Sequence, residues 1–325
     1  MSKYIGRLVK VGIGRETSRG AGVAPTYTLP FAKLAFDDKI VQARSVGALG
    51  NIADSEEAFV TTKYGQGDLD GELRASTLGV LLYALLGACS SSGPTDEAYT
   101  HSFTISQTNN HQSLAFVVSD SNTTELYKLV MIDSFKVNAA LDKVISYSAG
   151  FFSKCARDTG LTVPAVIHES KFTKKHISIK LADDIASLAA ATAISVKALN
   201  LNINKNVKID DVIGTAEPED ILNNQLSVDG DLELNYEAET YKLYMLNGTY
   251  KAMEIKLENA DDTIGTGSHP SLTIQLPKVS FHGWTPNYDL DKIANQKVSF
   301  KANKDVENSL EIISTCSLVN DVVSY

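Results

Sequence analysis

An internal repeat sets the strongest limit on how this chain of 325 residues can fold. Four blocks of the first half recur in the second half in the same order: 31–40 with 196–207, 67–73 with 230–235, 85–87 with 246–248, and 132–154 with 276–302. The offset is 163 residues at Gly67/Gly230 and 149 at Asp142/Asp291. Ordered blocks with similar offsets predict two copies of one supersecondary unit.

The blocks are typical of β-strands separated by turns, with one clear helix. Alternating apolar and polar residues predict strands over YTLPFAKLAFDDKIVQAR, AFVTTKYGQGDLDGELRA and SLAFVVSD, and two long strands on either side of Asp142-Lys143. STLGVLLYALLG predicts a helix that Ser76 caps and Gly87 ends. CSSSGPTDEAY predicts a polar loop, and 181–195 predicts a second helix or an alanine-rich flexible segment.

The predicted fold is therefore mainly β, with two tandem sandwich or barrel modules and a helix flanking each. We place the first module and an N-terminal arm at 1–160, a connection at 161–192, and the second module at 193–325.

Composition and charge exclude several classes of protein. The formal net charge of −9 argues against a surface that grips nucleic acid along its phosphates. No run approaches the roughly 18 apolar residues of a membrane-spanning helix. The N-terminus has no continuous apolar segment before a cleavage site, so we expect folding in a cytoplasm.

The glycine-rich stretch GIGRETSRGAG (12–22) does not fit a nucleotide-binding loop. Five residues separate Gly14 from Gly20 and Ala21 follows, whereas a Walker A loop needs four and then Lys-Ser/Thr. A flexible arm or turn fits better. The three cysteines are widely spaced, and no histidine has a second ligand at metal-binding spacing. The sequence predicts no catalytic residue, no metal site and no cofactor.

One acidic pattern stands out from the ordinary surface charges. Asp68, Asp70 and Glu72 project from one face of a predicted strand, and Asp229, Asp231 and Glu233 occupy the matching face in the second copy. Leu69, Leu73, Leu232 and Leu234 fall on the opposite face and should pack inside each module. These acids form either a solvent-exposed sheet face or a surface selected to be negative.

Several blocks resemble the tail tube proteins of long-tailed (siphovirus-type) bacteriophages. The resemblance is carried by VGIGRETSRGAGVAPTYTLPF, SEEAFVTTKYGQGDLDGEL, GVLLYALLGACSSSG and YTHSFTISQTNNHQSLAFVVSD. It is strongest over about residues 5–155, and the LLYALLG helix with the following YTHSFT segment is its most distinctive part. Over about residues 190–303 it rests mainly on the internal repeat.

The resemblance implies a β-sandwich module whose long strands join an inner barrel shared between subunits. Rings of such modules stack into a hollow tail tube through which phage DNA passes without specific binding. Two modules in one chain imply a ring of three chains with pseudo-six-fold symmetry, whereas one module plus a decoration domain would favour six chains. Further partners would be the tail tip, tape measure and terminator proteins, with no membrane, in a virion tail assembled in the host cytoplasm.

The resemblance also suggests roles for three sets of residues. The six acids named above would line the lumen. The loop 45–60 would reach the adjacent ring through Gly50, Asn51, Asp54, Glu56 and Glu57, and 211–224 is its second-copy counterpart, where Pro218 argues against regular strand pairing. Arg15, Glu16 and Arg19 would belong to an assembly arm.

Other functions remain open at this point. A tube protein of a phage-like bacteriocin or secretion particle would have the same fold. A virion decoration or adhesion protein would stay a discrete oligomer. An enzyme would need a deep polar pocket with perturbed titrating groups.

Overall fold

The computed structural model describes residues 5–48, 50–291 and 293–325, and these are mainly β-strand, as predicted. The strands of the first half are β1 (Lys10–Arg15), β2 (Tyr27–Thr28), β3 (Phe31–Arg44), β4 (Ala58–Glu72), β5 (Gly87–Thr95), β6 (Ala98–Ile105), β7 (Leu114–Ser119), β8 (Thr124–Ala140), β9 (Ser146–Ser153) and β10 (Arg157–Asp158). Those of the second half are β11 (Ile177–Ala182), β12 (Val196–Asn204), β13 (Lys208–Asp210), β14 (Asp220–Leu222), β15 (Ser227–Asn235), β16 (Lys251–Glu258), β17 (Ser271–Asn287), β18 (Asn295–Asn303) and β19 (Thr315–Asn320).

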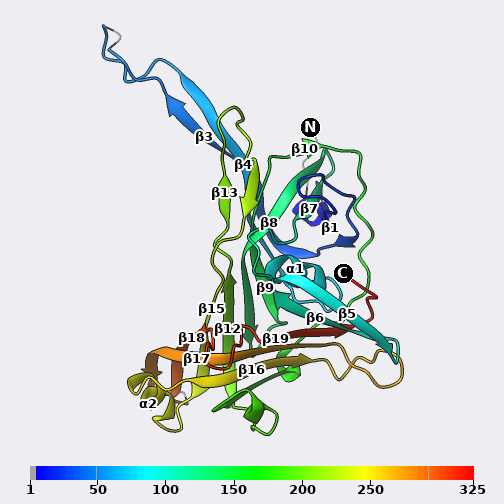
Figure 1. Cartoon of the computed structure of the whole chain (residues 1–325), viewed down its shortest axis with the longest axis vertical. Helices are drawn as coiled ribbons and strands as arrows, with labels where there is room; N and C mark the ends of the chain where they lie inside the picture. The colour runs from blue at the N-terminus through cyan, green and yellow to red at the C-terminus, as the bar shows by residue number, and fades with distance from the viewer. Residues whose placement is uncertain (1–4, 49, 292) are drawn as a thin grey trace.

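Helical structure is sparse in the same ranges. The α-helices are α1 (Leu78–Leu86) and α2 (Thr240–Leu246), and short 3₁₀ turns occur at Gly6–Leu8, Lys174–His176 and Ala186–Leu188. Figure 1 shows the β3–β4 hairpin projecting from one end of the molecule, with β16, β17 and α2 at the other end.

The repeated blocks form the same strand order in both halves. In the first half β3 pairs with β4, β4 with β9, and β9 with β8, all antiparallel. In the second half β12 pairs with β15, β15 with β18, and β18 with β17, again antiparallel. A β-bulge interrupts β8 at Asp133, between Ile132 and Ser134, and β17 at His282, between Phe281 and Gly283. The bulges occupy matching places in the two halves.

Glycine marks another matching position. A Cβ atom on Gly67 would lie 1.9 Å from the carbonyl oxygen of Ala35, and one on Gly230 would lie 2.3 Å from that of Asn200. The paired strands β3–β4 and β12–β15 approach each other so closely at this point that only glycine fits, and the point is the same in both halves.

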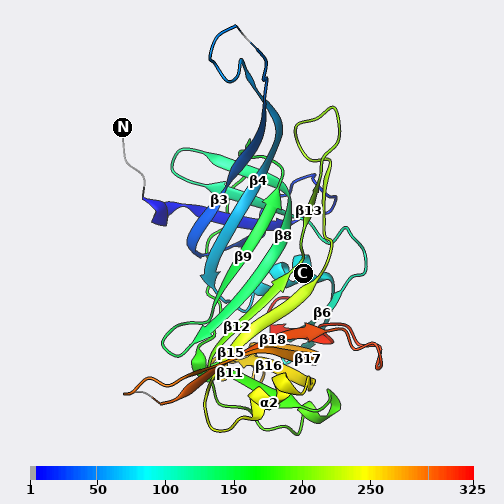
Figure 2. The same ribbon diagram turned by 90° about the vertical axis from the view of Figure 1, so that its left-hand side faces the viewer.

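The two halves join through one strand pair. β8 pairs antiparallel with β12, from Ser134 opposite Asn204 to Ala140 opposite Ala198. One continuous eight-stranded sheet results, in the order β3-β4-β9-β8-β12-β15-β18-β17. Figure 2 looks onto this sheet.

A second layer of strands covers one face of the eight-stranded sheet. The N-terminal part of β8 pairs with β7, and β7 with β1. The N-terminal part of β17 pairs with β16 and β19, which continue the layer to β11 on one side and to β6 and β5 on the other. Because β8 and β17 each have 17 residues, both reach from one layer into the other, and their bulges allow the bend.

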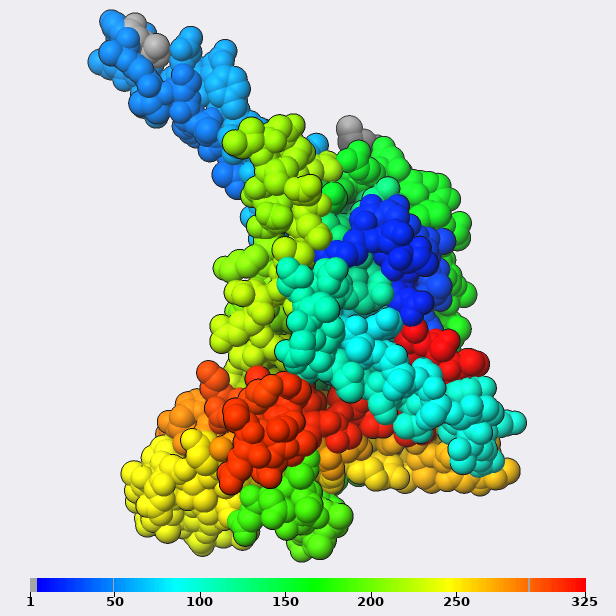
Figure 3. Space-filling model, viewed as in Figure 1, coloured from blue at the N-terminus to red at the C-terminus, as the bar shows by residue number. Residues whose placement is uncertain are grey.

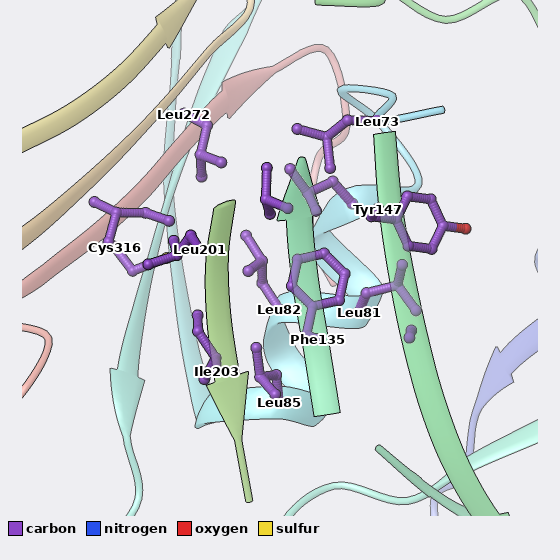
Figure 4. Close-up of a cluster of buried hydrophobic side chains, with 14 of the residues drawn as sticks. Leu73, Leu81, Leu82, Leu85, Phe135, Tyr147, Leu201, Ile203, Leu272 and Cys316 are labelled. Carbon is purple, nitrogen blue, oxygen red and sulfur yellow. The ribbon is translucent and has the colours of Figure 1, made fainter. Parts of the chain in front are cut away.

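Helix α1 lies inside the molecule, between the layers. Eight of its nine residues are buried. Leu81, Leu82 and Leu85 turn towards Phe135 of β8 and Leu201 of β12, as Figure 4 shows. Each buried leucine contributes about 1.5–3 kcal/mol relative to an exposed one. The predicted flanking helix is thus the centre of the core that both halves share.

The ends of α1 are held by residues from distant parts of the chain. Gly87 ends the helix with φ +93°, as predicted, and buried Lys205 donates its Nζ hydrogen to Ala84 O at 2.9 Å. The predicted Ser76 cap is wrong. The carboxylate of Glu169 instead accepts hydrogen bonds from the backbone N–H groups of Ser76 (3.1 Å) and Thr77 (2.7 Å).

Two further local predictions are wrong. Residues 181–195 form no α-helix: β11 extends to Ala182, a 3₁₀ turn follows, and Ile194 N donates to Ile179 O. The segment folds back on β11, where Ala193 forms a bridge with Lys180, so tertiary contacts override the helix propensity of the alanines. The predicted loop CSSSGPTDEAY contains β5, which forms a hairpin with β6.

Candidate functional site

The eight-stranded sheet has one buried and one polar face. Along β4 and β15, burial alternates so that Leu69 and Leu232 are fully buried while their neighbours are accessible. The six predicted acids lie together on the polar face: Asp68, Asp70, Glu72, Asp229, Asp231 and Glu233. Leu73 and Leu234 are buried with Leu69 and Leu232. The structure thus agrees with the sequence prediction of which residues of β4 and β15 face the core and which face the polar side.

Lysines that the sequence reading missed share this face. Lys33 lies opposite Asp70, Lys301 opposite Asp229, and Lys297 opposite Glu233 on the neighbouring strands. Lys136 of β8 is exposed on the same side. The face is thus of mixed charge, with the acids on β4 and β15 and the lysines on the strands beside them. In QKVSFKA (296–302) the lysines alternate with Val298 and Phe300, and this alternation would have predicted that the lysines lie on the polar face.

The acids differ in their surroundings. Asp231 accepts a hydrogen bond from Ser299 at 2.6 Å and lies 3.1 Å from Lys297 Nζ. Glu72 lies 2.7 Å from Lys171 Nζ and 3.3 Å from Arg74, and the hydrogen bond with Lys171 lowers the pKa of Glu72. Asp68 and Asp70 make no ion pair within the described part of the chain, so their charges face solvent.

The predicted stacking loop is the tip of a long hairpin. β3 and β4 pair up to Arg44 opposite Ala58, and Ser45 and Glu57 continue the pairing by hydrogen bonds. Gly50 has φ +72°, Asn51 accepts a hydrogen bond from Ala53 N, and Asp54, Glu56 and Glu57 are exposed. Figure 3 shows the tip standing clear of the other elements. Two isolated strands are marginally stable in water, so this hairpin is suited to contact another molecule.

Within the described ranges no three His, Cys, Asp or Glu side chains are placed to hold a metal ion. His101 contacts Ser91 and Asn320, and His111 contacts the carbonyls of Leu85 and Ser106. Burial lowers the pKa of both histidines, and both rings contact hydrogen-bonding partners inside the protein.

A protein-family model matches almost the whole chain. Residues 6–311 match the model of the phage tail tube protein family. The chain belongs to this family. A comparison with curated proteins finds no match. The chain is therefore a structural component of a phage virion tail, and its partners are further tail proteins, including its own copies. None of the described helices of this tail tube protein has the length and apolar character needed to span a membrane.

The proposed assembly arm of the tail tube protein is engaged within the chain. Arg15 donates to the backbone oxygen of Tyr325 at 2.6 Å, and its guanidinium lies over the Tyr83 ring. Glu16 is 2% exposed and accepts hydrogen bonds from Gly20 and Gly22, so it closes the glycine loop around itself. No pattern in the sequence indicated these contacts, and an additional role between subunits stays a prediction.

Arg19 links the glycine loop to the second half of the tail tube protein. Its guanidinium donates to Asp220 Oδ1, to Ile221 O and to His111 O. Asp220 and Ile221 belong to β14, which pairs with β13. The expectation that Pro218 prevents regular pairing over 211–224 is wrong for 220–222, because Pro218 lies in the connection before β14 and removes no ladder donor.

Proposed function

We propose that three copies of this tail tube protein form a ring and that the rings stack into the hollow tube through which phage DNA is ejected. Each chain supplies two tube modules, at 1–160 and 193–325, joined by the connection 161–192. The observation that carries the proposal is the open eight-stranded sheet built from two halves of identical strand order.

Strand number supports three chains. An eight-stranded barrel is about 16 Å across between backbones and is filled by its own side chains. Three chains give twenty-four strands and a diameter of about 48 Å, whereas six chains would give about 96 Å. An eight-stranded barrel has no room for a DNA duplex, twenty-four strands leave room for the duplex with its water and the inward-pointing side chains, and forty-eight strands would leave a far wider channel than the duplex needs. The pseudo-six-fold ring of three chains is therefore favoured over a hexamer.

The polar sheet face is proposed to line the lumen. Carboxylates on this face outnumber the lysines, and Asp68 and Asp70 have no cationic partner among the described residues. Each phosphate contact made by a lysine adds salt-dependent affinity that slows sliding. A face on which several lysines are already opposed by carboxylates lets DNA keep its counterions and pass without specific binding.

The remaining roles follow from this arrangement. The hairpin tip 45–57 contacts the adjacent ring, and the two ends of the tube bind tail tip or tape measure proteins and the terminator. Assembly takes place in the host cytoplasm. A tube of a phage-like bacteriocin or secretion particle would use the same geometry, and a contractile sheath bound outside the tube would indicate that particle.

Electron microscopy of the purified protein tests the proposal. The expected images show rings and tubes whose channel measures about 48 Å between the backbones that line it, with a narrower open bore inside the side chains and three-fold symmetry in averaged end views. Compact monomers at high concentration, even with a tail-tip nucleator added, would contradict the tube. Discrete oligomers that never stack would favour a decoration or adhesion protein.

A further inference from the structure

We propose that residues 280–287 of β17 pair antiparallel with residues 35–40 of β3 of a second copy, in the register that β8 and β12 show within the chain. The inference rests on the proposed ring and names the strand edges and residue pairs that close it.

Both edges are open in the single chain. β3 pairs with β4 on one side, and beyond Val279 β17 pairs with β18 on one side; the described residues give neither a ladder partner on the other side. Ala35, Asp37 and Thr285 are exposed. Unpaired edges of this length are templates for pairing with another chain. They are also the two outermost edges of the eight-stranded sheet.

The chain contains an internal example of the same joint. β17 matches β8 at an offset of 149, since Trp284 pairs with Val298 just as Phe135 pairs with Ala149. β12 matches β3 at an offset of 165, since Leu199 pairs with Leu232 just as Leu34 pairs with Leu69. The covalent joint between the halves is β8 with β12. The equivalent joint between chains is therefore β17 with β3.

The internal joint fixes the register between chains. We transfer each β8–β12 pair by adding 149 to the β8 residue and subtracting 165 from the β12 residue. Each resulting pair joins β17 of one chain to β3 of the second copy: Asn287 with Ala35, Pro286 with Phe36, Thr285 with Asp37, Trp284 with Asp38 and Gly283 with Lys39. Lys205 N donates to Asp133 O at the β8 bulge at 2.7 Å, so Ile40 N of the second copy should donate to His282 O. Pro286 supplies no N–H, so the joint depends on the residues around it.

The faces of the two strands agree with this register. Phe36 is buried against Phe116 and Phe151, on the core side of its sheet, and Pro286 lies on the core side of β17. Asp37 and Thr285 are both exposed on the polar side. A shift of one residue would bring a core-facing side chain opposite a polar-facing one across the whole joint.

The projecting hairpin supplies a second, independent observation. Inside the chain, Val207 and Ile221 at the root of the β13–β14 hairpin pack on Leu129 and Met131 of β8. The matching positions of β17, Lys278 and Ser280, are only partly buried. The β3–β4 hairpin carries exposed Ile40, Val41, Phe59 and Val60. Pairing in the proposed register brings Ile40 opposite His282 and Val41 next to it along β17 of the neighbouring chain, with Phe59 and Val60 one strand further away on β4.

Cysteine crosslinking tests the register in assembled tubes. In a background with Cys89, Cys155 and Cys316 changed to alanine, Asp37→Cys with Thr285→Cys places two thiols directly across the proposed joint. Directly opposed residues lie about 4.5–5.5 Å apart at Cα, within disulfide reach. Mild oxidation should give covalent dimers and trimers on a non-reducing gel, and the ladder should end at three.

Two matched variants calibrate this result. Lys136→Cys with Asn202→Cys occupies the same place in the internal joint and should give an oxidised monomer. Val41→Cys with Thr285→Cys is offset by four residues, about 13 Å, and should stay monomeric. A mixture of the single variants Asp37→Cys and Thr285→Cys should give dimers, because the crosslink joins different chains.

The outcomes separate the joint from the tube. If Asp37→Cys with Thr285→Cys stays monomeric in tubes while the internal pair oxidises, the proposed register is wrong and the tube stands. Preferential crosslinking of the offset pair also overturns it. If the 37/285 pair forms dimers but wild-type protein makes no rings or tubes, the joint is supported and the proposed function fails.

Discussion

Glu16→Ala should be among the most destabilising single changes in the first half of the chain. Glu16 Oε1 accepts hydrogen bonds from Gly22 N at 2.9 Å and Leu129 N at 3.2 Å. Its Oε2 accepts from Gly20 N at 2.8 Å and Ser113 Oγ at 2.6 Å. One carboxylate thus fastens the glycine loop to β8 and to the segment before β7.

The cost follows from which donors lose their acceptor. Water can reach Gly20 and Gly22 once the loop loosens, so those two bonds are partly replaced. Ser113 is fully buried and Leu129 is 2% exposed, so their donors stay unpaired. At about 1–3 kcal/mol for each unpaired buried donor, the loss is about 4 kcal/mol. At about 2–3 °C per kcal/mol for a domain of this size, the midpoint should fall by roughly 10 °C. Glu16→Gln keeps one acceptor and should cost about half as much.

The assay is thermal unfolding of unassembled protein, followed by circular dichroism, with trypsin cleavage after Arg19 as a local probe. Glu57→Ala, in the exposed hairpin tip, is the control and should leave both readouts unchanged. The expected order of stability is wild type, then Glu16→Gln, then Glu16→Ala. A midpoint within about 1 °C of wild type for Glu16→Ala, with no faster cleavage, would refute the role of this carboxylate.

Three further predictions concern charge, stacking and pH. The double variant Asp68→Lys with Asp70→Lys should fold normally and slow DNA ejection at low salt, and the difference from wild type should disappear as salt rises. Wild-type ejection kinetics at low salt would show that these acids do not line the lumen. Failure to assemble would show that they lie at an interface between subunits. Deleting 50–57 should give folded rings that do not stack in electron micrographs; normal tubes would show that another segment makes the contact. Burial and the nearby Arg19 charge lower the pKa of Lys205 to about 7, so the unfolded chain binds more protons above that pH. The free energy of unfolding should therefore rise between pH 7 and 10 by up to about 1.4 kcal/mol per unit relative to Lys205→Met, and identical pH profiles in denaturant titrations would contradict this.

Matching blocks in the sequence were enough to predict two copies of one β-rich unit, with strands at matching places in each half. The blocks at 31–40 and 196–207, for example, became β3 and β12, each the first strand of its four. Register was also accessible, because alternation separates Asp68 and Asp70 from Leu69. What the repeat could not show is that β8 pairs with β12, since a tandem repeat is equally compatible with two separate domains.

The errors came from contacts between distant segments. Glu169 takes the place of a Ser76 cap from a position 93 residues away, and no local pattern announces it. The alanines of 181–195 favour a helix in isolation, but the segment after Ala182 folds back on β11, where Ala193 forms a bridge with Lys180 and Ile194 N donates to Ile179 O. The glycine-rich stretch 12–22 was predicted to be a flexible arm or turn because Asp220, which binds Arg19, lies 201 residues further along the chain.

The two hairpins of the chain differ in shape although their roots match. The β3–β4 hairpin is continuous up to Arg44 and projects freely, whereas the β13–β14 hairpin is short and is tied back at two places. Lys63 N of β4 donates to Ala216 O, and Arg157 of β10 pairs with Glu217. A ring of three chains would therefore alternate tall and low hairpins around its rim. Such a ring can seat on the next at rotations that differ by 120°, but a rotation error of 60° would set each tall hairpin where a low one belongs. In such a ring the tall and low hairpins of each chain would leave three equivalent seating positions, and the angular order of one ring would be passed to the ring stacked upon it.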